Sequence, residues 1–437
     1  MIIYADQLSP RLKYIAAFIG RHINGRPPEI TDQKDVYFSY QGSRINYSLK
    51  SIHPAEIRIE PSGLLGQTGI HEQHIDISPD DPSFRFFKNN GDGGFDIFSA
   101  IFFLLTRYEE YLPHVKDQYG RYAHTNSVAF IYHFLQLPVI DRWLLELKQM
   151  LSAHYPPDNK KPDFKFHYLP TYDIDMAWSY REKGLVRNFA GITRAFLKGR
   201  TNECLERWNV WRGKTADPFD SFGWLDNLHN TYRLDPLYFF LLAERRGIYD
   251  KNIYPSGDTM RELVKRISSR YSVAIHPSWR SGDEPQLVER EIKILENLSG
   301  KKVNTSRQHY IRLTLPATYR ELDRLGIKHE HSMGYGSING FRASTSNSFY
   351  WYDLENEVET TLLVHPFCFM DANSFYEQHF SAGEALKELM HYYEVTSAVG
   401  GTLVTIFHNN FLGSDPQFNG WKETYETFIR SLPTLPG

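Results

Sequence analysis

This sequence has little cysteine, little net charge and no long apolar run. Its two cysteines, Cys204 and Cys368, are too few for a disulfide framework or a four-cysteine zinc site. The formal net charge of −3 does not attract nucleic acid or an anionic membrane. No stretch approaches the length of a membrane span, and residues 1–20 lack the continuous apolar core of a signal peptide. We therefore expect a cytoplasmic protein without a nucleic-acid or membrane partner.

The chain does contain enough apolar material for more than one core. Hydrophobic residues make up 41% of its 437 positions and aromatic residues 15%, and this length exceeds that of one ordinary domain. Residues 155–163 carry prolines and charges without apolar periodicity, which indicates a linker. This boundary predicts a smaller α+β domain of unknown role at residues 1–155 and a larger domain at residues 165–437.

The two predicted domains differ in their patterns. In the first, residues 35–59 alternate polar and apolar side chains and predict strands, residues 95–112 predict an apolar helix, and Asp141 is placed to cap another helix. In the second, apolar runs predict strands that alternate with amphipathic helices, which favours a mainly parallel sheet, open or closed into a barrel. The predicted strands are 236–242, 272–275, 359–364 and 401–407, the helices begin near 258, 285, 316 and 382, and residues 179–225 predict a helical insertion.

Two carboxylates follow the first predicted strand of the larger domain. The segment Thr171-Tyr172-Asp173-Ile174-Asp175 comes directly after an apolar run, so both acids lie near the carboxyl end of a strand, where active sites gather in barrel-type folds. A spacing of two in an extended segment points both side chains to one face. One carboxylate could then bind a metal while its neighbour acts as a base. An Asx turn or a helix cap is the structural alternative.

Histidines follow several other predicted strands. His276, His365 and His408 each come directly after a strand, and Arg307 and His309 lie in a stretch that also has an extended pattern. A single histidine in such a position is usually a hydrogen-bonded structural residue. Asp173, Asp175, His276 and His408 nevertheless all fall on the same predicted edge of one sheet, which favours a common site.

These segments together resemble the polysaccharide deacetylase (NodB-homology) family over residues 165–412. Thr171–Asp175 is similar to its first motif, His276-Pro277-Ser278 to its metal-binding histidine motif, and the segment at Arg307 to its arginine motif, while Thr405–His408 resembles its last motif. The resemblance implies a distorted (β/α) barrel of about seven strands and a hydrolase of non-peptide carbon–nitrogen bonds that deacetylates carbohydrates. It further implies Asp173 as general base, Asp175 and His276 as metal ligands, His408 as general acid, and Arg307 as the residue that orients Asp173.

The sequence departs from the family pattern at one ligand. The family has a second histidine four residues after the first, and Arg280 occupies that position here. A catalytic zinc site usually has three protein ligands. We predict that His309 supplies the third, with His365 as the alternative, and that the metal is Zn²⁺, with Co²⁺ or Ni²⁺ as alternatives.

Three functions are compatible with these residues. The first is a metal-dependent hydrolase that removes N- or O-acetyl groups from a carbohydrate. The second is a binding protein that keeps the fold but has lost catalysis through Arg280. The third is another metal-assisted hydrolase acting on a phosphate ester or a non-sugar amide. Retention of Asp173 and His408, an acid–base pair for which a binding protein has no use, favours the first.

Overall fold

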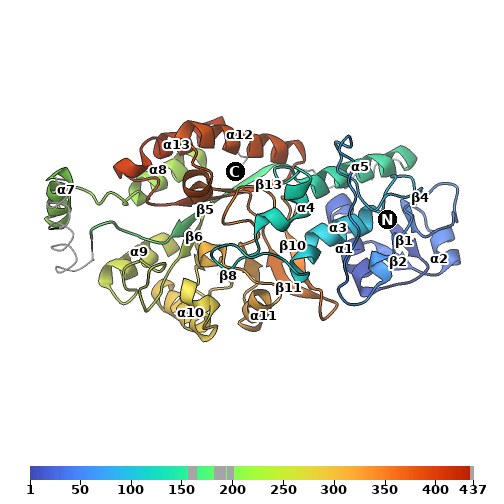
Figure 1. Cartoon of the computed structure of the whole chain (residues 1–437), viewed down its shortest axis with the longest axis horizontal. Helices are drawn as coiled ribbons and strands as arrows, with labels where there is room; N and C mark the ends of the chain where they lie inside the picture. Colours follow the sequence, from blue (N-terminus) through green and yellow to red (C-terminus); the bar gives the residue numbers. More distant parts are fainter. Residues whose placement is uncertain (156–164, 182–192, 194–200, 434–437) are drawn as a thin grey trace.

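The computed structural model describes residues 1–155, 165–181, 193 and 201–433. Most of the expected linker at 155–163 and part of the expected insertion at 179–225 lie outside the described residues. The described chain forms two sheets with helices packed against them, and the N-terminal region (residues 1–155) lies at one end of the molecule (Figure 1). No helix among these residues is long and apolar enough to cross a membrane.

The N-terminal region contains a four-stranded sheet in the order β2-β1-β3-β4, and its three ladders are all parallel. Residues 35–59, expected to be strands, contain β3 and β4 but begin within helix α2. The expected helix over residues 95–112 breaks at Arg107, which has a left-handed backbone (φ 56°). The elements are β1 (Ile2–Ala5), α1 (Pro10–Asn24), β2 (Glu29–Thr31), α2 (Lys34–Ser39), β3 (Arg44–Tyr47), β4 (Ile57–Arg58), α3 (Ile97–Leu105), α4 (Val128–Ile131) and α5 (Val139–His154).

The C-terminal region (residues 165–433) is built on a nine-stranded sheet in the order β10-β11-β9-β8-β7-β6-β5-β13-β12. The β10–β11 ladder is antiparallel and the others are parallel. The strands are β5 (His167–Ile174), β6 (Leu237–Phe240), β7 (Ser272–Ile275), β8 (Thr305–Ser306), β9 (His329–Glu330), β10 (Phe349–Asp353), β11 (Val358–Val364), β12 (Phe369–Met370) and β13 (Thr402–His408).

Helices pack against this sheet. In Figure 1, α8, α12 and α13 lie above the strands and α9, α10 and α11 lie below them, while α8 and α9 are neighbours joined by the ion pair of Asp226 with Arg266. Local sequence sets their ends: Ser381 and Glu384 form a capping box at the start of α12, and Gly300 ends α10 in a left-handed conformation. The helices are α7 (Thr201–Trp211), α8 (Phe222–Tyr232), α9 (Asp258–Ser268), α10 (Gln286–Ser299), α11 (Ala317–Arg324), α12 (Ala382–Ala398) and α13 (Trp421–Ser431).

The expected α/β class is confirmed, but closure into a barrel is not. Within the described residues, no ladder joins the two edge strands β10 and β12, and the sheet has nine strands where about seven were expected. Two of the additional strands, β9 and β12, contain only two residues. Runs this short have no measurable periodicity, which is why the sequence did not predict them.

The two regions share one apolar core and several buried polar contacts. The largest cluster of buried apolar side chains includes residues from both regions, from Ile3 to Ile429. Asp141 does not cap α5 as expected; its carboxylate accepts hydrogen bonds from the backbone N–H and hydroxyl of Ser346 and from the hydroxyl of Thr345. The N-terminal region is therefore fixed against the C-terminal region and not merely connected to it.

Candidate active site

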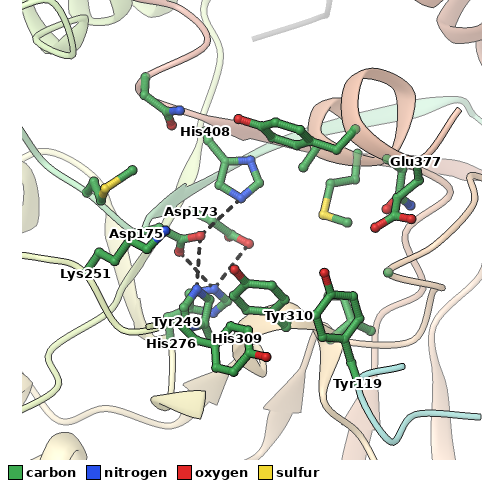
Figure 2. A pocket seen from close by; sticks show the side chains of 18 of the residues that line it. Tyr119, Asp173, Asp175, Tyr249, Lys251, His276, His309, Tyr310, Glu377 and His408 are labelled. Atoms are coloured by element: carbon green, nitrogen blue, oxygen red, sulfur yellow. Dashed lines mark ion pairs between the residues drawn. The ribbon is translucent and has the colours of Figure 1, made fainter. Parts of the chain in front are cut away.

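A pocket of about 530 Å³ lies at the carboxyl ends of the parallel strands. Among the residues that line it are five of the six predicted site residues: Asp173, Asp175, His276, His309 and His408 (Figure 2). The sixth, Arg307, is fully buried behind Asp173. These residues come from β5, from the ends of β7 and β13, and from the segment after β8, and the parallel ladders bring those ends to one edge.

Alternate side chains of strand β5 point to opposite faces, and this alternation directs Asp173 into the pocket. Thr171 and Asp173 both accept hydrogen bonds from Nη1 of Arg307, at 2.9 and 2.7 Å, so they face the same side. Tyr172, between them, points to the opposite side and contacts His229 and Tyr425. The guanidinium of Arg307 is held by these two acceptors and by the carbonyl of His331, and it fixes the position of the Asp173 carboxylate.

Asp175, His276 and His309 form a compact cluster. Their potential ligand atoms all lie within 4.8 Å of one another. Nε2 of His276 lies 3.2 Å from Oδ1 of Asp175, and Nε2 of His309 lies 3.2 Å from Oδ2. One carboxylate and two imidazoles are a common protein ligand set for catalytic zinc.

The hydrogen bonds of the two imidazoles test whether a cation fits this cluster. Nδ1 of His276 lies 2.6 Å from the carbonyl oxygen of Arg307, and Nδ1 of His309 lies 3.0 Å from a carboxylate oxygen of Asp250. Because these oxygens only accept, each Nδ1 carries a hydrogen, and each Nε2 faces Asp175, where it can hold either a proton or a cation. Oδ1 of Asp175 is buried and has no hydrogen-bond partner. Facing acceptors of this kind need a cation or a proton between them, so the residues fit a divalent metal.

The electrostatics of the cluster agree with a cation-binding role. Burial alone would raise the pKa of Asp175, but His309 and hydrogen bonds from the neighbouring histidines hold it well below its usual range. Burial alone would lower the pKa of His309, but the Asp175 and Asp250 carboxylates raise it to about 9. Asp175 therefore stays ionised at neutral pH and attracts positive charge, either the proton on His309 or a cation in its place, to the space between these residues.

His408 also faces the Asp175 carboxylate, from the side opposite His276 and His309 (Figure 2). Its Nε2 is 3.5 Å from Oδ2 of Asp175, and its Nδ1 is 2.6 Å from Oδ1 of Asp371. The backbone N–H of His408 also donates to Asp371. Burial lowers the pKa of His408, but Asp371 and Asp175 outweigh it and raise this pKa well above the usual range. His408 can therefore hold a proton on Nε2 at neutral pH.

Arg280, which replaces the second histidine of the family pattern, and His365, the alternative third ligand, both lie away from the cluster. Arg280 is exposed, in a short 3-10 turn, and its Nε pairs with Glu284 at 2.5 Å, so it does not enter the pocket. His365 lies in a separate group of histidines, with its Nε2 3.0 Å from His329 and its ring stacked on His331. Of the two alternatives for a third ligand, His309 is the one beside Asp175.

Sequence reasoning assigned no role to several residues that shape the site. Asp250, which orients His309, lies in the loop after β6, and no local pattern marks it. Asp371 follows the two-residue strand β12, too short to be recognised. The aromatic side chains Tyr119, Tyr249 and Tyr310 form one wall of the pocket (Figure 2). Tyr119 belongs to the N-terminal region, and only the fold brings it here.

Comparisons with known proteins each match part of this chain. A family model described as "Family of unknown function (DUF7033)" matches residues 1–156. No curated protein is similar enough in sequence to be matched.

Three crystal structures of proteins described as polysaccharide deacetylases resemble part of this chain. The protein from Mycobacterium smegmatis is 14% identical, with a TM-score of 0.39 over 62% of this chain and 84% of its own. The Bacillus cereus protein is 12% identical, with a TM-score of 0.31 over 61% of this chain and 87% of its own. The protein from Pseudomonas aeruginosa PAO1 is 13% identical, with a TM-score of 0.38 over 63% of this chain and 91% of its own. Similarity this distant carries no argument about the present chain, so its function is argued from its own residues.

Proposed function

We propose that this protein is a metal-dependent hydrolase that removes N- or O-acetyl groups from a carbohydrate. The observation that carries the proposal is that an acid–base pair, Asp173 and His408, adjoins the Asp175–His276–His309 cluster. Oδ2 of Asp173 lies 3.6 Å from Nε2 of His276, and Nε2 of His408 lies 3.5 Å from Asp175. The resemblance of the sequence motifs to carbohydrate deacetylases supports the choice of substrate class.

Asp175, His276 and His309 would hold the divalent metal, most simply Zn²⁺, with Co²⁺ and Ni²⁺ as alternatives. A cation bound there supplies positive charge that lowers the pKa of an attacking water and polarises an acyl carbonyl. Asp250 and the carbonyl of Arg307 fix the rings of His309 and His276 by occupying their Nδ1 hydrogens. The three ligands therefore come preorganised.

Asp173 and His408 would move the protons. Arg307 donates to Oδ1 of Asp173 and leaves Oδ2 on the pocket side to accept a proton from the attacking water. His408 holds its proton because Asp371 raises its pKa, and it donates that proton from Nε2 to the departing amine or alkoxide. Each group has its own orienting partner, Arg307 for the base and Asp371 for the acid.

The first test is metal analysis and acetate release. Purified protein, supplemented with zinc, cobalt or nickel, is expected to retain about one metal ion per chain. It is then assayed for acetate release from a panel of N- and O-acetylated mono- and oligosaccharides. Protein that binds glycans but retains no metal and releases no acetate would instead be a binding protein with a degenerate site.

The second test removes the acid–base pair. Asp173→Asn keeps the shape of the side chain but cannot accept the proton, and His408→Ala removes the proton donor. Each change is expected to lower kcat by about 10²–10⁴-fold. The metal content should stay near that of the wild type, because neither residue belongs to the Asp175–His276–His309 cluster, and the Tm is measured to show that each variant remains folded. His365→Ala is the matched control, since this histidine also follows a strand but lies outside the pocket. Loss of activity in the control alone would contradict the assignment.

A further inference from the structure

A short hairpin of the N-terminal region reaches into the pocket. Lys116 and Tyr122 pair in an antiparallel bridge and define this 116–122 hairpin. Its turn is fixed locally: Oδ1 of Asp117 accepts hydrogen bonds from the backbone N–H groups of Tyr119 and Arg121, at 2.9 and 3.0 Å, and Gly120 has a φ of +75°. Such a turn favours glycine, and the Asx contacts hold its tip in one conformation.

Arg121 anchors the hairpin to the C-terminal region. It is buried, its Nε pairs with Asp117 at 2.7 Å, and its Nη1 donates to the carbonyl oxygen of Tyr310 at 2.6 Å. A Cβ added to Gly336 would lie only 1.9 Å from this Nη1, so the guanidinium fills the space beside that glycine. The hairpin is therefore seated closely against the segment that carries His309.

Tyr119, at the tip, joins an aromatic group of the C-terminal region. Its ring centroid lies 5.4 Å from that of Tyr310, 5.9 Å from that of Trp279 and 6.2 Å from that of Tyr249. Figure 2 shows its side chain across the pocket from Glu377 and to one side of the Asp175 cluster. The Tyr119 side chain is half-buried, so part of it remains free to contact a ligand.

We propose that Tyr119 packs against a sugar ring next to the unit that carries the reacting acetyl group, so that the N-terminal region forms part of the binding site. The identity of the ligand as a saccharide rests on the proposed function. The C–H face of a sugar ring is apolar and packs against an aromatic side chain. Tyr119 lies beside the metal-ligand cluster and not over it, so it contacts a neighbouring unit. Tyr119 thus favours oligosaccharides over monosaccharides.

The test compares binding of a trimer and a monomer, with triacetylchitotriose and N-acetylglucosamine as probes. On metal-free protein, Tyr119→Ala is expected to raise the Kd of the trimer by about 3- to 10-fold, the scale of one aromatic contact. The Kd of the monomer should change by less than about 2-fold, and Tyr119→Phe should bind the trimer like the wild type. Phe38→Ala is the control, because Phe38 is an exposed aromatic residue of the same region outside the pocket.

The possible failures are distinguishable. Acetate release together with an unchanged Kd and KM for the trimer in Tyr119→Ala would overturn this inference and leave the proposed function intact. Trimer binding that Tyr119→Ala weakens, without acetate release by the wild type, would support this inference and remove the proposed function. Equal losses in Tyr119→Phe and Tyr119→Ala would assign the contact to the hydroxyl and overturn ring packing. Failure of the wild type to bind the trimer would also overturn it.

Discussion

At the scale of single residues, His309 is the side chain on which the proposed metal site depends. The position where the family resemblance requires a histidine holds Arg280, which pairs with Glu284 at the surface. His309 reaches Asp175 from a different strand end, after β8, and Asp250 fixes its ring. The proposed ligand set is thus completed from another part of the sheet edge, and the presence of Arg280 does not by itself remove the candidate site.

This assignment predicts that His309→Ala lowers zinc affinity by at least about 10-fold, since even residues that only support a ligand contribute 10- to 100-fold. Affinity is measured by competition with a chromogenic chelator, and the Tm reports whether the variant remains folded. His365→Ala should bind zinc like the wild type, because that residue packs on His329 and His331. Wild-type affinity in His309→Ala, or a loss in His365→Ala, would mean that the third ligand is misassigned.

At the scale of elements, the segment between β8 and α11 carries backbone strain beside the metal ligands. Tyr310 and Ile311 follow His309 and have φ values of +58° and +53°, a region that non-glycine residues rarely adopt. Such residues persist only where their surroundings hold them. The Arg121 side chain supplies one such restraint through its hydrogen bond to the Tyr310 carbonyl.

We therefore expect Arg121→Ala to loosen the segment that positions His309. The Tyr310 carbonyl loses a charged donor, which costs about 1–3 kcal/mol of stability, and zinc affinity should fall because His309 is less well held. Calorimetric melting and chelator competition measure the two effects. Arg85→Ala is a matched control, since its partner Glu146 is half-exposed and both lie in the N-terminal region. An Arg121→Ala variant with a lower Tm but wild-type zinc affinity would limit Arg121 to a structural role.

At the scale of the whole molecule, a buried ion-pair network joins the two regions. Glu110 accepts hydrogen bonds from Arg107, in its own region, and from Arg342, in the C-terminal region. All three side chains are almost completely buried. Removing one partner of such a network leaves uncompensated buried charge, which is far more costly than the loss of a surface pair.

Glu110→Gln should accordingly lower the free energy of unfolding by about 3–5 kcal/mol at pH 7. Burial alone would raise the pKa of Glu110, but Arg342 and Arg107 lower it to about 2, below the ordinary value of 4.5. The stabilisation is therefore fully present above about pH 4.5 and is lost as the pH falls toward about 2, so the difference between wild type and variant should shrink over that range. Urea unfolding at several pH values measures this. The control is Glu146→Gln, which breaks the half-exposed pair with Arg85 and should lower the free energy of unfolding by less than about 1 kcal/mol. If Glu110→Gln lowers it by no more than this control, the buried network does not stabilise the protein as proposed.

The elements that sequence periodicity identified well are those with enough residues to show a period. The predicted strand at 272–275 coincides with β7, and the predicted strand at 359–364 lies within β11. The expected strands over residues 35–59 are present as β3 and β4, but the start of that range is the short helix α2, which has too few turns for its period to stand out. The break after α3 was missed because Arg107 and Glu110 are held by buried ion pairs that lie partly outside the local sequence.

The sequence alone determined that Asp173, Asp175, His276 and His408 would meet at one edge of a sheet. Each lies at or just beyond the end of a strand, and the carboxyl ends of parallel strands share an edge, so local periodicity was sufficient. Only the tertiary structure decided which histidine stands beside Asp175, that Asp250 and Asp371 orient the imidazoles, and that Tyr119 enters the pocket. These contacts join residues far apart in the chain, and their partners are selected by the packing of the two regions on one core, which no local pattern encodes.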